Sequence, residues 1–221
     1  MAITIKKLYV KYSNFTLDVS DLKIKHGINL LIGPNGAGKT TLMESMVGLR
    51  VPEIHEIFYR DEKLKIPLTV KFKEKLAFFP SLPPIYKHKT IKYHKKLWNI
   101  LYPDFDEDRY KDLMELFNLT KKKKTIELSS GERRMFFFSL LLAYSPQIFI
   151  LDEPFAFLDP IQSKKMLGEL ISYVRENKNA IIFISSHLID WLQKYEFYTF
   201  IIRDGKIIKE GTVEEKYETF F

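Results

Sequence analysis

The stretch that decides the fold is Gly33-Pro34-Asn35-Gly36-Ala37-Gly38-Lys39-Thr40, which fits the pattern G-x-x-x-x-G-K-[ST] at every fixed position. The apolar run 28–32 comes directly before it, and a helical pattern follows it. A strand that leads through a glycine-rich loop into a helix is the context that this pattern requires. The stretch therefore predicts an α/β fold, with the loop at the end of a strand that is buried on both faces.

The chemistry expected of this loop follows from its backbone. Glycines allow successive N–H groups to turn towards phosphate oxygens, and the helix that begins there adds its positive end. Lys39 would place a charge at the β- and γ-phosphates, Thr40 a hydroxyl at Mg²⁺, and Thr41 a hydroxyl at the α-phosphate. We therefore expect the phosphates of a nucleotide and Mg²⁺ as ligands rather than a glycine-rich turn with a chance lysine. The rest of the predicted cradle consists of Asn35, Gly36, Ala37 and Gly38.

Two carboxylates follow a second apolar run, residues 148–151. The carboxyl end of a parallel strand lies at the ligand edge of its sheet. Asp152 is therefore predicted to hold the Mg²⁺ that Thr40 also contacts, and Glu153 to act as general base on the attacking water. An acidic pair after a strand is otherwise more often a solvated loop, and the upstream phosphate loop favours the functional interpretation.

The remaining segments indicate how the sheet is built. Residues 3–25 alternate between apolar and polar, as antiparallel strands with one wet face do. Short apolar runs at 76–79, 148–151 and 180–184 alternate with helical patterns, which predicts a mostly parallel sheet covered by helices. Asp204-Gly205 is a strong hairpin signal. The other predicted helices cover residues 90–102, 106–119, 132–144, 162–177 and 187–194. We expect one domain over 1–221, with a helical subdomain at about 83–145 inserted in the core.

A family resemblance is carried by motifs in a fixed order. Leu128-Ser129-Ser130-Gly131-Glu132 resembles the signature, usually Leu-Ser-Gly-Gly-Gln, of ATP-binding-cassette (ABC) ATPases. Phe157-Leu158-Asp159-Pro160 resembles the loop after their acidic strand, and Ser185-Ser186-His187 resembles their switch histidine segment. Tyr12 stands where an adenine-stacking aromatic is placed in that family. Over nearly the whole chain, the set resembles the nucleotide-binding subunits of ABC transporters.

That resemblance implies a mechanism with two cassettes, as a homo- or heterodimer, packed head to tail around two ATP. Ser129 and Gly131 would donate hydrogen bonds to the γ-phosphate of the ATP held by the other cassette. His187 would contact the γ-phosphate and orient Glu153, and Asp159 would shape the dimer interface. The simpler alternatives are a histidine at a helix start, a turn before Pro160 and, for Tyr12, an aromatic of the core.

The resemblance also implies a separate membrane-spanning partner, with this chain peripheral on the cytoplasmic face of the membrane. One departure affects the site: Ser81 stands where the family has a glutamine, and its shorter side chain reaches less far towards Mg²⁺. Ser130 and Glu132 also depart from the usual signature, and a negative charge in the first turn of a helix is favourable. Because Lys39 and the acidic pair are retained, an active ATPase is expected.

Charge and composition narrow the alternatives. The chain has 35 Lys and Arg against 28 Asp and Glu, and no cysteine, which excludes a disulfide scaffold and thiolate metal sites. Residues 87–124 contain eleven of the basic residues and six of the acidic ones, an excess of five, so this segment is either a solvated face or a surface facing the membrane complex. Solvent exposure is expected for four histidines: His26, His55, His88 and His94.

Two other functions remain open on the sequence. The first is a non-transport ABC ATPase that acts on nucleic acid or on the ribosome. No nucleic-acid partner is expected, because only 90 positions separate Lys39 from Ser129 and no heptad pattern lies between them. The second is a scaffold that dimerises on nucleotide binding without hydrolysis, and Glu153 argues against it.

Overall fold

The computed structural model describes residues 2–119, 124–187, 192, 195 and 197–212. The strands are β1 (Ile3–Lys11), β2 (Thr16–Ile24), β3 (Gly27–Ile32), β4 (Ile54–Tyr59), β5 (Glu62–Lys63), β6 (Leu76–Phe79), β7 (Ile148–Asp152), β8 (Ile181–Ser186), β9 (Tyr198–Arg203) and β10 (Lys206–Thr212). The helices are α1 (Lys39–Met46), α2 (Val70–Lys73), α3 (Ile91–Leu101), α4 (Glu107–Leu116), α5 (Ser130–Tyr144) and α6 (Pro160–Glu176), with a 3₁₀ turn at Thr125–Glu127.

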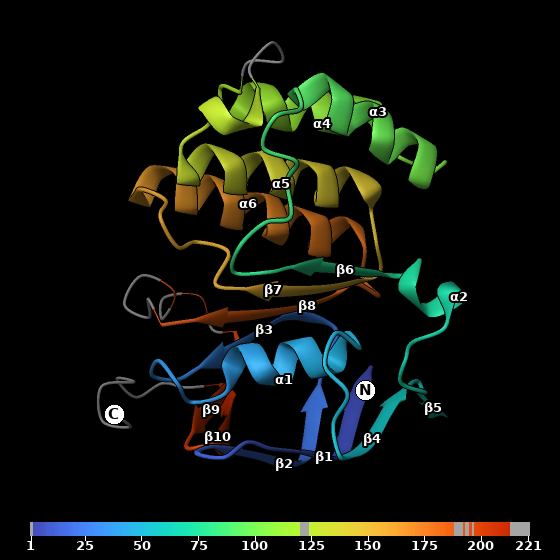
Figure 1. Ribbon diagram of the computed structural model, residues 1–221, viewed down its shortest axis with the longest axis vertical. Helices are drawn as coiled ribbons and strands as arrows, with labels where there is room; N and C mark the ends of the chain where they lie inside the picture. Colours follow the sequence, from blue (N-terminus) through green and yellow to red (C-terminus); the bar gives the residue numbers. More distant parts are fainter. Residues whose placement is uncertain (1, 120–123, 188–191, 193–194, 196, 213–221) are drawn as a thin grey trace.

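The strands form two sheets (Figure 1). The smaller one has the order β2-β1-β4-β5 and is antiparallel throughout. The larger one has the order β10-β9-β3-β8-β7-β6 and is parallel except for its β9–β10 hairpin. The predicted α/β fold, with a mostly parallel sheet and an N-terminal antiparallel sheet, is therefore confirmed.

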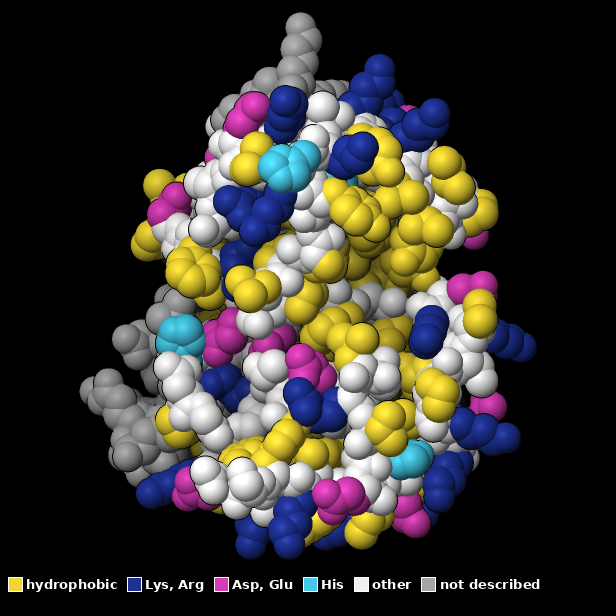
Figure 2. Space-filling view, in the orientation of Figure 1, with side chains coloured by type: hydrophobic (Ala, Val, Ile, Leu, Met, Phe, Trp, Pro, Cys, Tyr) yellow, Lys and Arg dark blue, Asp and Glu magenta, His cyan; other side chains and the backbone are white. Residues whose placement is uncertain are grey.

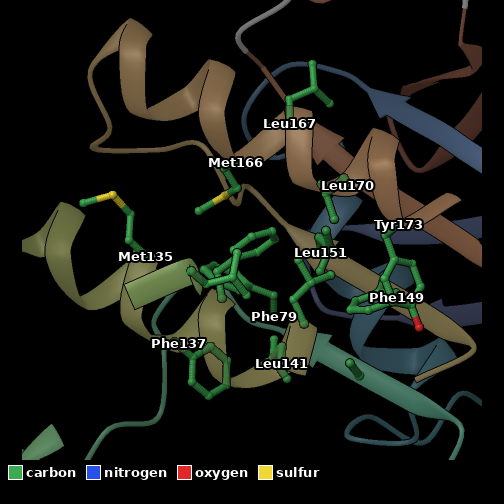
Figure 3. Close-up of a cluster of buried hydrophobic side chains, with 14 of the residues drawn as sticks. Phe79, Met135, Phe137, Leu141, Phe149, Leu151, Met166, Leu167, Leu170 and Tyr173 are labelled. Carbon is green, nitrogen blue, oxygen red and sulfur yellow. The ribbon is translucent and has the colours of Figure 1, made fainter. Parts of the chain in front are cut away.

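Helices separate and cover these sheets. Helix α1 lies between them, and its buried side chains Leu42 and Met43 belong to the apolar cluster that also contains residues of β1, β2, β7 and β8. On the other face of the large sheet lie α5 and α6, with α3 and α4 as an outer layer (Figure 1). Figure 3 shows the cluster beneath α5 and α6, where Phe79, Phe149 and Leu151 of the strands meet side chains of both helices.

The helix boundaries differ by about one turn or less from those expected. Helix α5 begins at Ser130 rather than 132, because Ser129 forms a capping box with Glu132. Helix α6 begins at Pro160 rather than 162, because Asp159 accepts hydrogen bonds from the first free N–H groups and proline suits the first helical position. The four-residue α2 was not expected at all. Most of the predicted helix 187–194 lies outside the described residues, as do three of the four lysines in 121–124.

One histidine corrects the sequence analysis. His94 is 3% exposed, whereas a solvated position was expected. Its Nε2 accepts a hydrogen bond from the Tyr86 N–H at 3.0 Å, and its Nδ1 lies 2.9 Å from the Thr90 carbonyl oxygen. Its ring also lies 5.7 Å from that of Phe136 in α5. Burial lowers the pKa of His94, so the ring is held in its neutral form.

The β9–β10 hairpin turns at Asp204-Gly205, as predicted, and contacts two other parts of the chain. The Gly205 N–H donates to the Ala37 carbonyl oxygen at 3.1 Å, and its carbonyl oxygen accepts from the Asp18 N–H at 2.8 Å. Gly205 has a φ of +75°, and a Cβ there would lie 1.9 Å from the Thr16 carbonyl oxygen. Only glycine fits, so the hairpin joins β2 to the loop before α1.

Candidate functional site

Polar side chains gather where three neighbouring strands of the large sheet end. The strands β3, β8 and β7 are adjacent and parallel, so their carboxyl ends share one edge of the sheet. The glycine-rich loop follows β3, Glu153 follows β7, and His187 follows β8. Asp152 and Ser185 are direct register partners on β7 and β8. Sheet topology thus brings together groups that are more than a hundred residues apart.

The loop after β3 curls in the way its glycines predict. Gly36 and Gly38 have φ angles of +81° and +105°, which few other residues adopt. A Cβ on Gly38 would lie 2.8 Å from the Phe15 ring, and one on Gly33 would lie 2.4 Å from the Ile202 carbonyl oxygen. Close approach of the backbone therefore requires glycine at both positions.

The loop encloses a pocket of about 230 Å³. The Lys39 ammonium lies back along the loop, where it donates to the carbonyl oxygens of Gly33 at 2.7 Å and Pro34 at 3.2 Å. The start of α1 and the charge of Lys39 thus lie at one small space, and a helix N-terminus beside a positive charge suits an anion. The pocket is lined by Phe15, Pro34, Asn35, Gly36, Gly38, Lys39, Thr40, Thr41 and Glu153.

Asp152 is fully buried and has two hydroxyl partners. Thr40 Oγ1 donates to its Oδ2 at 2.8 Å, and Ser185 Oγ donates to its Oδ1 at 2.6 Å. Burial raises the pKa of Asp152, and the two hydrogen bonds oppose that effect. A buried carboxylate beside a hydroxyl is an all-oxygen donor set of the kind that Mg²⁺ prefers. The residues present therefore fit the predicted metal.

Glu153 has an unusual backbone and a well-defined side chain. Its φ is +48°, in the left-handed region that costs a non-glycine residue about 1–3 kcal/mol. Its N–H donates to Ser185 Oγ at 2.9 Å. Its carboxylate lies 3.5 Å from the Lys39 ammonium and 2.8 Å from His187 Nδ1. The two residues predicted to carry and to assist general-base chemistry are thus in contact, beside the phosphate loop.

The signature segment lies at the start of α5. Ser129 Oγ accepts a hydrogen bond from the Glu132 N–H at 3.1 Å, and the Glu132 carboxylate accepts one from the Ser129 N–H at 2.8 Å. Ser129 is exposed, and its hydroxyl proton remains available to a further acceptor. A Cβ on Gly131 would lie 3.0 Å from the Phe157 carbonyl oxygen, so the helix start is close-packed against the loop after β7. None of residues 128–132, all of which the structure describes, lines the pocket.

Tyr12, Asp159 and Ser81 also lie outside the pocket lining, as do the predicted site residues Ala37, Asp152 and His187. Tyr12 is exposed, with its ring 6.2 Å from that of Phe15, which does line the pocket. Asp159 caps α6 by accepting from the N–H groups of Ile161 and Gln162, each at 2.8 Å. Ser81 is exposed, and its carbonyl oxygen accepts a hydrogen bond from Arg134. The adenine contact of Tyr12, the interface role of Asp159 and the place of Ser81 near Mg²⁺ stay predictions.

The sequence analysis did not assign roles to three residues that this geometry singles out. Phe15 lines the pocket, Ser185 bridges Asp152 and Glu153, and Arg134 donates to the Glu153 carbonyl oxygen at 2.9 Å. A serine at the end of a buried strand was a usable signal for Ser185. The partners of Arg134 are not visible from local sequence.

Comparison with known proteins identifies the family. The family model described as ABC transporter matches residues 17–156, which is more than half of the chain. The chain belongs to the ABC transporter family. The matched span includes the phosphate loop, the signature and the acidic pair, and the chain is an ABC ATPase.

Individual relatives agree with this assignment. The energy-coupling factor transporter ATP-binding protein EcfA of Methanocaldococcus jannaschii is 30% identical over 224 aligned positions, covering 96% of this chain and 79% of that protein. The lipopolysaccharide export system ATP-binding protein LptB of Escherichia coli K12 is 29% identical, covering 84% and 79%. A solved ATP-binding subunit of an ABC transporter has the same fold, with a TM-score of 0.83 at 24% identity, covering 100% of this chain and 93% of that one.

Proposed function

We propose that this chain is the ATP-hydrolysing subunit of a transporter, which pairs head to tail with a second cassette around two ATP and drives a separate membrane-spanning chain. It would act as one cassette domain, with residues 83–145 as its helical subdomain. The observation that carries the proposal is the contact of Glu153 with both Lys39 and His187 at the rim of the phosphate pocket. This places a base, a cation and an orienting group around one reacting centre.

Hydrolysis would use these groups as follows. When ATP binds, the Lys39 ammonium would leave the carbonyl oxygens of the loop and bind oxygens of the β- and γ-phosphates. Glu153 would then no longer be paired with that ammonium. The Glu153 carboxylate accepts a proton from the attacking water, a contribution of about 10²–10⁴-fold for general-base catalysis. His187 donates one hydrogen bond through its ring and holds the carboxylate in place. Thr40 and Asp152 would hold Mg²⁺, which supplies positive charge at the phosphates.

Two copies are needed because each contributes half of the ligand shell. Ser129 and Ser130 of the signature segment are exposed, and no residue of that segment lines the pocket of its own chain. A second cassette packed head to tail would bring its Ser129 hydroxyl and α5 start to the γ-phosphate, where a helix N-terminus favours an anion. Loss of the γ-phosphate removes that contact and opens the pair, which is the mechanical step.

The surface around α3 supports a membrane partner. Large apolar side chains are exposed on α3 and on the loop that precedes it, at Leu82, Tyr86, Tyr93, Ile100 and Leu101. Figure 2 shows apolar side chains gathered along this part of the molecule. No helix within the described part of the chain is long and apolar enough to cross a membrane. We propose that this surface docks on a separate permease chain at the cytoplasmic face of the membrane.

The two-copy proposal is tested by size-exclusion chromatography of Glu153→Gln with ATP and Mg²⁺. The amide cannot accept the proton, so ATP persists, and a stable dimer is expected. The control is Glu62→Gln, a change of the same kind at an exposed residue of β5. Protein that stays monomeric with bound ATP would count against the head-to-tail pair.

The partner proposal is tested by co-purification of the tagged chain with membrane-spanning proteins from detergent-solubilised membranes. Leu101→Asp puts a charge on the apolar surface and should reduce co-purification while leaving the ATPase rate of the isolated chain unchanged. Ile208→Asp is the control, because Ile208 is also exposed but lies on β10. A salt-sensitive affinity for nucleic acid with stimulated ATPase, and no membrane association, would favour the non-transport alternative.

A further inference from the structure

Arg134 is a buried charge that the mechanism so far does not use. It lies about one turn into α5, and 3% of the residue is exposed. Its guanidinium lies 5.5 Å from the ring centre of Phe79 and 5.6 Å from that of Phe157. Burying a charge is costly unless its hydrogen-bonding groups are satisfied, so a function of this residue should be sought in its partners.

Arg134 donates hydrogen bonds to one residue of the site, Glu153, and to Ser81 in the loop after β6. Nη1 donates to the Glu153 carbonyl oxygen at 2.9 Å, and Nη2 donates to the Ser81 carbonyl oxygen at 2.5 Å. The planar guanidinium can serve two carbonyl groups at once, as a lysine ammonium on a flexible stem cannot do with the same geometry. The side chain therefore connects α5 to the loop after β6 and to the loop after β7.

The hydrogen bond from Arg134 to Glu153 holds the backbone of Glu153 beside its strained φ angle. Ser185 holds the peptide group before the Glu153 Cα through its N–H, and Arg134 holds the peptide group after it through its carbonyl oxygen. Between these two anchors Glu153 keeps a φ of +48°, and its carboxylate reaches Lys39 and His187. A strained conformation of this kind persists only where the surroundings over-determine it.

We propose that Arg134 is a positioning residue for ATP hydrolysis, which fixes the backbone of Glu153 and ties it to the start of α5. The inference rests on the proposed role of Glu153 as general base. It has a consequence for the paired cassettes. The start of α5 would contact the γ-phosphate of the ATP held by the partner, whereas Glu153 acts on the ATP of its own chain. Arg134 is thus the link through which occupancy of one ATP site alters the geometry of the other.

The first test compares steady-state ATPase of Arg134→Gln, Arg134→Lys and wild type. Arg134→Gln should lower kcat by about 10–100-fold, the range seen when a residue that supports a metal ligand through a hydrogen bond is replaced. Arg134→Lys should fall between, because it keeps the charge but lacks the planar fork that holds both carbonyl groups in a fixed geometry. ATP affinity, measured by equilibrium binding, should change by less than about threefold, and the Hill coefficient for ATP should fall towards about one.

The matched control is Arg109→Gln. Arg109 in α4 also lies over an aromatic ring, at 5.1 Å from Tyr173, and donates to Glu176, but it is remote from the pocket. It should change the melting temperature without changing kcat or the Hill coefficient. If Arg134→Lys keeps the wild-type kcat and Hill coefficient, the proposal is wrong. The same holds if Arg134→Lys and Arg109→Gln lower kcat equally.

A double-variant cycle separates this inference from the proposed function. Arg134 acts through Glu153, so adding Arg134→Lys to Glu153→Gln should lower the residual rate by less than about twofold. If the double variant instead shows the product of the two single-variant losses in kcat, Arg134 acts independently of Glu153 and the inference is wrong. A wild-type kcat in Glu153→Gln alone would instead remove the general base from the proposed function. Because Lys preserves charge and stem, the cycle stays interpretable if Arg134→Gln does not fold.

Discussion

At the ends of β3 and β7, Lys39 and Asp152 are buried and Glu153 is half-buried, and each of them contacts another polar group of the site. In the outer layer of α3 and α4, ion pairs such as Lys95–Glu107, at 2.7 Å, lie at the surface. Apart from His94, the buried side chains of that layer make apolar and aromatic contacts instead, as between Phe105 and Tyr110, whose ring centres are 5.6 Å apart. The structure at the strand ends therefore depends on a few hydrogen bonds and ion pairs, whereas the layer of α3 and α4 depends on buried apolar area.

This difference predicts how each region responds to change. Directed bonds between buried charges have narrow geometry, and a lost partner leaves an unsatisfied group that costs about 1–3 kcal/mol. Aromatic packing tolerates small displacements, and exposed ion pairs contribute about 0–1 kcal/mol. The site should therefore be sensitive in its chemistry, whereas the outer layer should be free to adapt to a docked partner.

The largest effect is expected from Glu153→Gln compared with Glu107→Gln. The first removes the proposed base and should lower kcat by about 10²–10⁴-fold. The second breaks an exposed ion pair of the outer layer and should leave kcat within about twofold, because such pairs are screened. Steady-state phosphate release measures both. Equal losses would mean that the outer layer takes part in the chemistry.

Ser185→Ala should have the next largest effect. It removes the donor to Asp152 Oδ1 and the acceptor for the Glu153 N–H, so unfolding should become easier by about 1.5–3 kcal/mol. The ATPase rate should fall as well. Ser139→Ala is the control, since its equally buried hydroxyl donates only to the Met135 carbonyl oxygen of its own helix. Urea unfolding of both variants gives the comparison, and equal losses would contradict it.

A smaller effect is expected from two aspartates that cap helices. Asp159 caps α6, and Asp106 caps α4 by accepting from the N–H groups of Asp108 and Arg109. Replacing either with alanine should lower the free energy of unfolding by about 1 kcal/mol. Only Asp159→Ala should also weaken the ATP-dependent dimer of the Glu153→Gln background. A dimer that is unaffected would leave Asp159 as a helix cap alone.

The smallest effect concerns pH and the outer layer. Burial lowers the pKa of His94 in the folded chain, so below about pH 6.5 the unfolded chain binds more protons at this residue. Its contribution to stability is therefore present above that pH and is lost as the pH falls, by at most about 1.4 kcal/mol per pH unit. His94→Gln should flatten the pH dependence of the melting temperature between pH 5 and 7. If the variant shows the same change of melting temperature with pH, that pH dependence comes from other groups.

Local patterns predicted the phosphate loop, the Asp152 strand end and the Asp204-Gly205 hairpin, because each is encoded in a few consecutive residues. The contacts of Ser185 and Arg134 could not be predicted in this way, since their partners lie 19 to 53 residues away along the chain. His94 was a different case. It lies one turn from the buried Ile91 on α3, so the helical period already placed it on the inner face.

At the starts of two helices, residues that were predicted to be functional also cap the helix. Ser129 and Asp159 were assigned to ligand and interface roles through the resemblance, and both are also N-caps in the structure. The pattern Ser-x-x-Glu at 129–132 is itself a capping-box signal. A residue that a helix requires for its own stability would be retained even without a ligand role, so the cap alone does not indicate function.

Gly205, at the tip of the last hairpin, has the least room for a side chain of any glycine in the described chain. Its N–H is bonded to Ala37 of the phosphate loop, although the two are distant in sequence. If every residue is substituted in turn and growth or activity is measured, most substitutions in exposed β10 should be tolerated, whereas those at Gly205 should not be. A suppressor of such a variant should arise near Thr16, where the added Cβ would collide, rather than among the nucleotide ligands.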